Sequence, residues 1–423
     1  MAEKTKLLSL IMVCVMFLTG AAGCRQVERT ASIYEQSDRK ENLVYERKQT
    51  LKDRGYLSLT EKDEQDAYAN IDITVHNMYS SKFDIPKSIF DNFGNILEIY
   101  KNDHPEVFWL KDDVPYSYFN TGDSVTIMLE FKLDGEELVS MQDTFIAKVK
   151  AILATAPFDG TDFEKELYVN DYLVDNVTYD KEALELHKDK KIRANEQNAY
   201  GALVDGVAVC EGYARAFQLL CMELGIDCAV IEGYADETND KTKETVRSAH
   251  IWNCIYLDGD WYHVDPTWND DVQGEYADVY TRRYYYLNLT TAEIEVDHVI
   301  NPLYSEKETT EKSDWYNNFV PECTSDEYNY FNYNCETFTS FKNTDRLVKA
   351  LAESAKEGKP YFDFLIDKRL NFDKIKKTIA EGTGFAWIKQ ANEINEHYPE
   401  ISDQCELFTF KDRRLVTFLL KYY

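Results

Sequence analysis

The 423-residue sequence has few of the features that identify several common protein classes. It contains no Cys-x-x-Cys pair, and its histidines do not cluster with cysteines at zinc-finger spacing, so a structural zinc site is not expected. Basic residues number 47 against 76 acidic ones, and the net charge of -29 disfavours a nucleic-acid partner, which needs a basic face. Glycine and proline number only 17 and 9, which excludes a low-complexity chain. The sequence therefore predicts an ordinary globular protein with more than one domain.

The N-terminus carries two lysines, then the apolar run "LLSLIMVCVMFLTGAAG", then Cys24. A basic start, an apolar stretch and small residues predict a signal peptide, and the run is short for a membrane span. The segment "AAGC" resembles a bacterial lipobox, in which the cysteine is lipidated and becomes the first residue of the mature chain. Ala21 stands where that pattern prefers Leu, and a plain secretory signal cut nearby is the alternative. Both readings predict a protein outside the cytoplasm. A lipidated Cys24 would anchor it to the outer face of the cell membrane.

The predicted organisation has six parts. They are a signal peptide (1–23), a polar tether (24–54), an N-terminal α+β domain (55–157), a central domain (158–303), a linker (304–328) and a C-terminal α/β domain (329–423).

Helical periodicity in the N-terminal domain predicts helices at 60–79, 89–100 and 136–154. The segment "HPEVFWL" and a hairpin around Gly122 supply the predicted strands.

The central domain opens with Thr161 and Glu164 at capping-box spacing, which predicts a helix from that point. A second helix is predicted in "VAVCEGYARAFQLLCMELGIDC", where apolar residues recur every three or four positions and Gly225 ends the pattern. The periodic set, expected to form one buried face, is Ala214, Phe217, Leu220, Cys221 and Leu224. Strands are predicted in "CAVIEGYA", "AHIWNCIYL" and "WYHVDPTW", and the run Tyr284–Tyr286 is expected to be a half-buried strand. The C-terminal domain reads as a βαβαββ-like unit with helices at 344–356 and 372–381.

The last two strands of the central domain are expected to form a hairpin. Asp258 and Gly259 are the residue types that favour a two-residue turn. In that register Trp252 faces Asp265, so His250 and Asp265 share one sheet face as diagonal neighbours. A three-residue turn would move Asp265 to the opposite face. The two-residue turn therefore predicts a His–Asp couple.

Cys210 stands at the predicted start of the second helix, after a glycine-containing turn. Backbone N–H groups and the helix dipole favour a thiolate at that end. His250 could take the thiol proton, and Asp265 could fix the tautomer of the imidazole. The backbone N–H of Cys210 is a candidate oxyanion donor. A cysteine or a strand histidine alone is more often structural, but the conjunction of all three favours nucleophilic catalysis.

These residues carry a family resemblance. The segments "NAYGALVDGVAVCEGYARAFQLL" and "AHIWNCIYLDGDWYHVDPTWND" resemble the bacterial transglutaminase-like superfamily over about residues 160–290. The resemblance implies an α+β fold with a papain/transglutaminase-like core, in which an antiparallel sheet packs on the nucleophile helix. It implies Cys210 as nucleophile, His250 as base and Asp265 as the residue that orients the base, with no metal or organic cofactor. "HPEVFWL" also resembles the N-terminal block attached to such domains in bacterial lipoproteins.

The predicted function is an extracytoplasmic Cys-His-Asp enzyme that acts on peptide or glutamine amides through a thioester. Its expected partners are peptide or protein substrates at the cell envelope. If an amine resolves the thioester the enzyme is a transglutaminase, and if water does so it is a cysteine protease or amidase. The alternative is a non-catalytic binding or scaffolding lipoprotein built on the same domain.

Several smaller predictions accompany this reading. His263 is a rival base, and Tyr179 and Tyr200 are candidate second oxyanion donors. Seven cysteines remain beyond the signal and Cys24, so at least one thiol is free. The cysteines expected in the core are Cys221, Cys228 and Cys254, and the pair that could form a disulfide is Cys323 with Cys335.

Overall fold

The computed structural model describes residues 44–77, 82–111, 115–120, 122–182, 195–238, 244–270, 280–300, 320–395 and 399–423. Cys24 and the predicted signal peptide lie outside these ranges. The chain divides into two compact units. Unit 1 comprises Met1–Tyr256 with Glu295–Glu322, and unit 2 comprises Leu257–Ile294 with Cys323–Tyr423. Among the described residues, none of the helices combines the length and apolarity needed to cross a bilayer.

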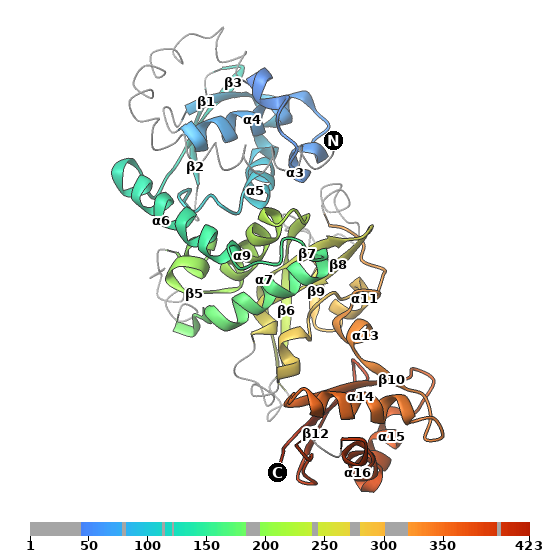
Figure 1. Ribbon diagram of the computed structural model, residues 1–423. Coiled ribbons are helices and arrows are strands. Elements are labelled where there is room, and N and C mark those ends of the chain that lie inside the picture. The colour runs from blue at the N-terminus through green and yellow to red at the C-terminus, as the bar shows by residue number, and fades with distance from the viewer. Residues whose placement is uncertain are drawn as a thin grey trace, which may run out of the picture. The chain divides into compact units, whose positions relative to one another are not determined.

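The N-terminal block of unit 1 combines helices with a small sheet (Figure 1). Its elements are α3 (Arg54–Ser58), α4 (Lys62–Asn77), β1 (Lys82–Pro86), the 3-10 helix η1 (Lys87–Asn92), α5 (Phe93–Asp103), β2 (Tyr116–Asn120), β3 (Ser124–Leu129) and α6 (Gly135–Leu153). The strands form an antiparallel sheet in the order β1-β3-β2. The predicted helices and the hairpin around Gly122, whose φ is 95°, are confirmed. β1 was not predicted, because its only apolar signal is Phe83 and Ile85.

The segment "HPEVFWL" is not the predicted strand. Only Leu110 makes a ladder contact, an isolated bridge to Phe131. Phe108, Trp109 and Leu110 are all buried in succession, whereas a half-buried strand points alternate side chains to opposite faces. Pro105 also lacks a backbone donor for pairing. The run is hydrophobic because it fills the core of the block, not because it belongs to a sheet.

Residues 44–53, assigned from sequence to the tether, pack on α4 in the structure. Residues 44–48 are helical. Arg47 forms an ion pair with Asp72, and Lys48 Nζ lies 2.5 Å from Asp66 Oδ1. The folded part of unit 1 therefore already includes the stretch before α3.

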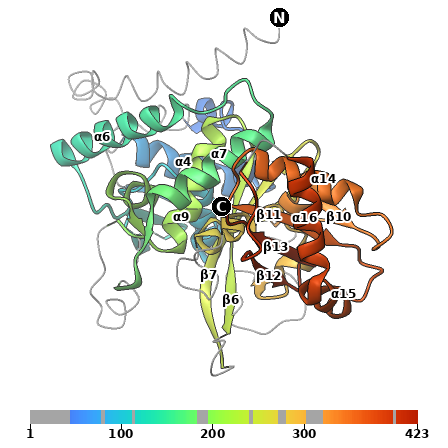
Figure 2. The ribbon, with the colours of Figure 1, turned by 60° about the horizontal axis from the view of Figure 1, so that its bottom comes forward.

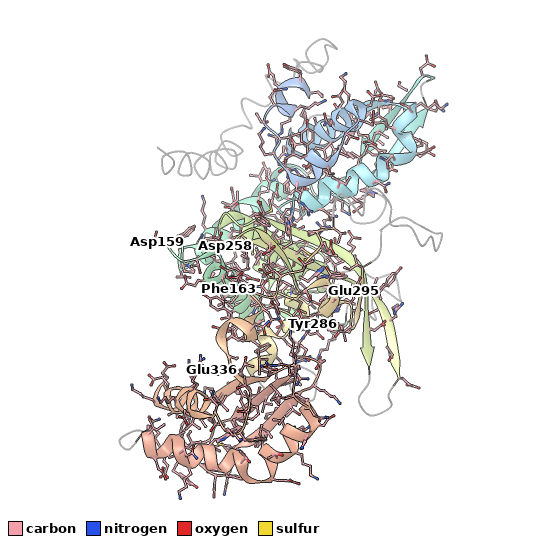
Figure 3. The ribbon with its side chains drawn as sticks, turned by 90° about the vertical axis from the view of Figure 1, so that its right-hand side faces the viewer. Asp159, Phe163, Asp258, Tyr286, Glu295 and Glu336 are labelled. Atoms are coloured by element: carbon pink, nitrogen blue, oxygen red, sulfur yellow. The ribbon has the colours of Figure 1, made fainter. Side chains whose placement is uncertain are left out.

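The central part of unit 1 begins with α7 (Asp162–Asn176). Thr161 and Glu164 form the predicted capping box, and Asp159 lies on the turn before it (Figure 3). The remaining elements are β4 (Thr178–Tyr179), a π-helical turn η2 (Gly201–Asp205), β5 (Val207–Ala208), α9 (Cys210–Glu223), β6 (Cys228–Thr238), β7 (Thr245–Leu257) and β9 (His298–Ile300). β6 pairs antiparallel with β7 on one side and with β9 on the other, and β6 and β7 run together as a long ribbon (Figure 2).

Helix α9 is buried far more completely than predicted. Its predicted apolar face is confirmed, and Gly225, with φ 83°, follows the helix end as expected. However, every residue from Gly212 to Cys221 is buried, polar ones included. The N-terminal block explains part of this burial: Arg215 Nη1 donates to Lys101 O at 2.8 Å, and Gln218 Nε2 donates to Asn102 O at 2.6 Å. The end of α5 therefore accepts hydrogen bonds from the helix that begins at Cys210.

Unit 2 starts with β8 (Asp260–Val264), which follows a two-residue turn. Asp258 and Gly259 occupy that turn with φ of 45° and 108°, so the predicted turn length is confirmed. The short elements that follow are α10 (Pro266–Asn269), the 3-10 helix η3 (Tyr280–Tyr284), α11 (Thr291–Ile294) and α13 (Tyr330–Asn334). The predicted strand "WYHVDPTW" thus ends at Val264, and the residues after it form a helical turn.

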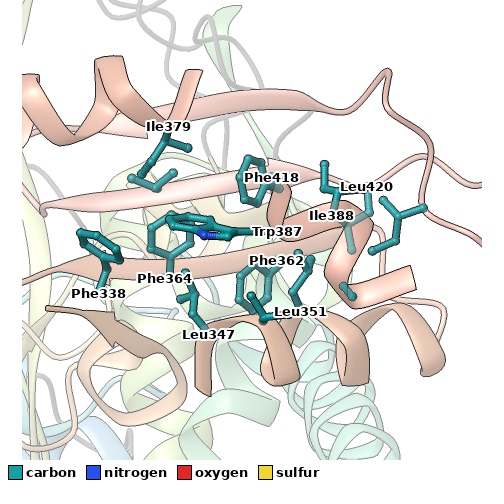
Figure 4. Close-up of a cluster of buried hydrophobic side chains, with 14 of the residues drawn as sticks. Phe338, Leu347, Leu351, Phe362, Phe364, Ile379, Trp387, Ile388, Phe418 and Leu420 are labelled. Atoms are coloured by element: carbon teal, nitrogen blue, oxygen red, sulfur yellow. The ribbon is translucent and has the colours of Figure 1, made fainter. Parts of the chain in front are cut away.

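The C-terminal part of unit 2 confirms the predicted alternation of strands and helices and adds one helix. Its elements are β10 (Glu336–Phe338), α14 (Asp345–Lys356), β11 (Tyr361–Ile366), α15 (Phe372–Thr378), a π-helical turn η4 (Ile379–Thr383), α16 (Gly384–Ile394), β12 (Glu406–Phe410) and β13 (Leu415–Leu419). The sheet order is β10-β11-β13-β12, with β10 and β11 parallel and the other pairs antiparallel. Phe364 of β11 and Trp387 of α16 lie at the centre of its hydrophobic cluster (Figure 4).

Aromatic and charged contacts join the early part of unit 2 to this sheet. Tyr285 donates a hydrogen bond to Asp412, and the Arg413 guanidinium lies 5.0 Å from the Tyr285 ring centre. Burial is the main cause that raises the pKa of the Tyr285 hydroxyl, and the negative charge of Asp412 raises it further. The run Tyr284–Tyr286 is fully buried and ends a 3-10 helix, which contradicts the half-buried strand expected from its composition.

Phe364→Ala should destabilise the C-terminal sheet by about 3–5 kcal/mol, because the fully buried ring leaves a cavity. Hydrogen exchange of peptides from β11 and β13 measures the local free energy of opening. Phe385→Ala is the matched control, since Phe385 of α16 is 51% exposed, and it should change that energy by about 0.5 kcal/mol or less. Equal effects of the two variants would contradict the core assignment.

Candidate active site

Cys210 is the first residue of α9, and the preceding chain holds it there. Gly206, with φ 71°, ends the π-helical turn η2, and β5 then pairs in parallel with β4. Val209 is extended, and its N–H donates to Glu196 O at 2.9 Å. The first N–H groups of a helix have no partner inside it, so the start of α9 presents donors beside the thiol.

Two glycines let the loop at residues 195–198 pack directly against the start of α9. A Cβ atom on Gly212 would lie 2.7 Å from Glu196 O, and one on Gly201 would lie 2.0 Å from Asn195 O. Both distances are well inside van der Waals contact. Gly201 and Gly212 therefore allow the chain to pack closely around the start of α9.

Cys210 differs from the other cysteines near it in exposure. Cys221, Cys228 and Cys254 are buried, which confirms their assignment to the core, whereas Cys210 is partly exposed. Burial, followed by the neighbouring Cys228, raises the pKa of the Cys221 thiol well above its usual value. Cys210 is thus the accessible thiol of α9.

None of the seven cysteines in the described part of the chain forms a disulfide. The disulfide considered for Cys323 and Cys335 is therefore not formed. Cys323 instead lies in the interior of unit 2, where its N–H donates to Thr291 Oγ1 at 3.1 Å. The tyrosine-rich loop between the two cysteines suggested a crosslink, but loop composition does not fix the separation of two thiols.

His250 lies on β7, opposite Gly233 of β6, and is buried. A Cβ atom on Gly233 would lie 2.1 Å from Val299 O, so glycine is what allows β9 to approach at this level. The His250 ring stacks at 6.1 Å on Trp252, which shares its face of the strand.

The sequence reasoning missed His298, which is a neighbour of His250. The two imidazole rings lie 5.3 Å apart with a T-shaped arrangement, and His298 is almost fully buried. Its Nδ1 lies 2.6 Å from Asp297 Oδ1. No local motif marks His298, because β9 is only three residues long and reaches β6 from far along the chain.

Asp265 belongs to unit 2, where it is the N-cap of α10. Its Oδ1 accepts hydrogen bonds from Thr267 N at 2.9 Å and Trp268 N at 3.1 Å, and Pro266 occupies the first helical position. Its own N–H donates to Tyr286 O at 3.0 Å. The carboxylate is fully buried and its orientation is fixed by this cap.

His263, the rival base, is held within unit 2. Its Nε2 lies 3.2 Å from Thr291 Oγ1, and its backbone pairs with Leu289. These contacts give His263 a structural place beside α11.

Within unit 1, one buried side chain ties the Cys210 helix to the His250 strand. Asn253 Nδ2 donates to Ala214 O at 3.0 Å. Ala214 stands one helical turn after Cys210, and Asn253 stands three residues after His250. The first turn of α9 therefore lies alongside the stretch of β7 that carries His250. Asp265 belongs to unit 2.

The two tyrosines considered as oxyanion donors have different surroundings. The Tyr200 ring packs 4.8 Å from Phe108 and 5.8 Å from Phe145, so it serves the core shared with the N-terminal block. The Tyr179 ring lies 6.4 Å from Tyr213 of α9. The backbone N–H of Cys210 remains the donor best placed by the helix geometry.

Acidic residues gather where α5, α9 and β6 meet. Glu211 Oε1 lies 2.8 Å from Arg215 Nη2, and Glu98 Oε2 lies 3.0 Å from Lys101 Nζ. Burial, followed by the negative charges of Glu211 and Glu98, raises the pKa of Glu232 to about 7. The positive charges of Arg215 and Lys101 lower the pKa of Glu232, but they do not fully offset burial and the negative charges of Glu211 and Glu98.

Part of this chain is similar in sequence to known proteins. Residues 153–266 match the family model described as the transglutaminase-like superfamily. Kyphoscoliosis peptidase of Homo sapiens and that of Mus musculus are each 30% identical over 82 residues, which is 18% of this chain and 12% of each relative. The chain thus spans about an eighth of the length of these relatives. A crystal structure of a TGase covers 47% of this chain and 54% of its own, with 14% identity and a TM-score of 0.28.

Glu232→Gln should raise the free energy of unfolding at pH 8 by about 1–3 kcal/mol, because it removes a carboxylate whose charge is disfavoured in the folded state. The pKa of Glu232 is raised from 4.5 to about 7 in the folded protein. The loss of folding stability caused by its negative charge is therefore absent below pH 4.5 and complete above pH 7. Denaturant unfolding of wild type and variant at pH 4.5 and pH 8 measures the difference, which should nearly vanish at the lower pH.

Asp236→Asn on the same strand is the control for that measurement. Asp236 Oδ1 lies 2.7 Å from Arg247 Nε, and the hydrogen bond from Arg247 lowers the pKa of Asp236. Its neutralisation should not increase stability at either pH. A gain for Asp236→Asn equal to that for Glu232→Gln would show that net charge, and not the local carboxylate group, sets the effect.

Proposed function

Because residues 153–266 form a transglutaminase-like domain in an α+β fold, we propose that the protein is an enzyme in which Cys210, His250 and Asp265 transfer acyl groups from peptide or glutamine amides. Cys210 is the nucleophile, His250 the base and Asp265 the residue that orients the base. The observation that carries this proposal is a partly exposed thiol at the first residue of a helix that is buried from Gly212 to Cys221.

In the proposed first step, His250 accepts the thiol proton and the Cys210 sulfur attacks the amide carbonyl carbon. The carbonyl oxygen becomes an oxyanion, which the backbone N–H of Cys210 stabilises. His250 then gives its proton to the departing nitrogen as the C–N bond breaks, which leaves a thioester on Cys210 and releases an amine. Asp265 holds the imidazole in the tautomer that both proton transfers require.

In the second step, a nucleophile attacks the thioester and regenerates the thiol. An incoming amine gives a new amide, which is transglutaminase chemistry, and water gives an acid, which is protease or amidase chemistry. Both nucleophiles give up a proton to His250, so the same three residues serve either outcome. The acceptor that reaches the thioester decides between them.

The proposed place of action is the outer face of the cell membrane, with a lipid on Cys24. The support is the apolar leader followed by "AAGC". Cells that express the protein and are fed a labelled fatty acid should incorporate the label into wild type. Cys24→Ala should carry no label and should appear in the soluble fraction. A labelled Cys24→Ala protein would contradict lipidation at this residue.

Alkylation of Cys210 tests the nucleophile. Iodoacetamide at pH 6, read by peptide mass, should label Cys210 in wild type about tenfold faster than in His250→Ala, because only a thiolate paired with a protonated imidazole reacts well at that pH. Cys405 is the internal control: it is partly exposed, and burial raises the pKa of its thiol. Its labelling should be slow and equal in both proteins.

A second measurement separates catalysis from binding alone. Incubation with glutamine-containing peptides and a labelled primary amine should give an acyl adduct on Cys210 or a product amide, and Cys210→Ser should give neither a thioester nor a product. If Cys210 labels identically in wild type and His250→Ala, and no acyl adduct is trapped, the non-catalytic binding role stands in place of this proposal.

A further inference from the structure

A second cluster of ionisable side chains lies in the N-terminal block of unit 1, outside the transglutaminase-like residues. Asp72 and His76 are one helical turn apart on α4, and His104 and Glu106 follow the end of α5. One ligand atom from each of Asp72, His76 and His104 lies within 4.8 Å of the other two. We call Asp72, His76 and His104 the α4–α5 triad.

Both imidazole rings of the triad are oriented through the same nitrogen. His104 Nδ1 lies 2.9 Å from Glu106 Oε1, and His76 Nδ1 lies 3.0 Å from the backbone oxygen of Asp72. Because both partners are acceptors, each Nδ1 must be the donor. In the neutral rings the lone pair is therefore on Nε2. A carboxylate or backbone oxygen behind a histidine is the usual support of a metal-binding imidazole.

One polar atom at the centre of the triad makes no hydrogen bond. It is His104 Nε2, which is buried and lies 3.8 Å from Asp72 Oδ1, beyond hydrogen-bond distance, whereas Asp72 Oδ1 itself lies 3.2 Å from His76 Nδ1. The side chains of Asp72 and His104 are 3% and 8% exposed. The other oxygen of Asp72 is held by Arg47. A buried polar atom without a partner is costly, so His104 Nε2 indicates that a ligand belongs between it and Asp72 Oδ1.

We propose that Asp72, His76 and His104 bind a divalent transition-metal ion of the zinc type. Two imidazole nitrogens and one carboxylate oxygen suit such an ion, whereas Mg²⁺ and Ca²⁺ prefer ligand sets made of oxygen. Three protein ligands leave a fourth position for water. Metal–ligand distances of about 2.0–2.2 Å require the three donors to move closer together than they stand, and His76, whose side chain is 38% exposed, has room to move.

The position of the triad indicates what the ion does. It would join the C-terminal half of α4 to the chain just after α5. The last turn of α5 includes Lys101 and Asn102, whose backbone oxygens accept the hydrogen bonds from α9. The bound ion would therefore stabilise the support on which the Cys210 helix rests. This inference does not depend on the activity proposed above.

The test uses the full chain after removal of metal with a chelator. Titration with Zn²⁺ in competition with a chromophoric chelator should show one equivalent bound by wild type. His76→Gln should bind about 100-fold more weakly or not at all, and Glu106→Gln about tenfold more weakly because the His104 ring loses its support. Lys48→Ala is the matched control: it removes a neighbouring ion pair with Asp66 and should leave zinc affinity unchanged.

Cobalt absorption and thermal unfolding complete the test. Co²⁺ at this site should give visible bands without the strong near-ultraviolet band of a thiolate ligand, and Zn²⁺ should raise the melting temperature of wild type and Lys48→Ala but not of His76→Gln. His76→Gln retains a polar, partly exposed side chain, so it keeps the test valid if a His104 variant fails to fold. The proposal is overturned if wild type binds no zinc, if His76→Gln binds it equally well, or if the cobalt spectrum shows thiolate ligands.

Discussion

The burial of α9 is the constraint on which the rest of unit 1 depends. This helix begins at a partly exposed cysteine, is enclosed from Gly212 to Cys221 and is exposed again at Met222. Enclosure of this kind requires partners on every side. They are the β6–β7 ribbon, α7, the loop at 195–198 and the end of α5. The thiol is presented by the helix end, and the surrounding elements keep that end in place.

Polar contacts inside this enclosure fix the position of the helix along its axis. Apolar packing alone tolerates small sliding movements, whereas a buried hydrogen bond allows one register. Asn253 binds the backbone oxygen of Ala214, Gln218 binds that of Asn102, and Arg215 binds that of Lys101. Each donor is a buried side chain and each acceptor is a backbone oxygen. The register of α9 is therefore set from both the sheet and the N-terminal block.

Sequence reasoning succeeded where a signal is local. The spacing of Phe217, Leu220 and Leu224 predicted α9, and Thr161 with Glu164 predicted the start of α7. Asp258-Gly259 predicted the turn before β8, because few residue pairs accept two positive φ angles. These signals depend on a few neighbouring residues and on backbone conformation. The roles of Cys210, His250 and Asp265 came from the combination of such signals with a family resemblance, and they stay a proposal.

Sequence reasoning failed where contacts between distant parts of the chain determine the local structure. "HPEVFWL" and Tyr284–Tyr286 have strand-like composition, but their side chains fill cores built by other elements. His298 reaches His250 only because β9 pairs with β6, and the α4–α5 triad forms only because two helices pack together. No spacing rule within a segment contains that information. The helix α16 was missed for a related reason, since Gly382 and Gly384 interrupt the helical pattern at the π-helical turn before it.

The hydrogen bonds between α5 and α9 also indicate which parts of the chain must be kept together when it is truncated or recombined. The family match begins at residue 153, yet Arg215 and Gln218 of α9 find their acceptors at residues 101 and 102. A fragment cut at the family boundary would expose the side of Tyr200 that packs on Phe108 and Phe145, and it would remove the backbone oxygens that Arg215 and Gln218 bind. The N-terminal block and the transglutaminase-like residues should therefore be exchanged, truncated or recombined together, because contacts that position α9 come from residues outside the family match.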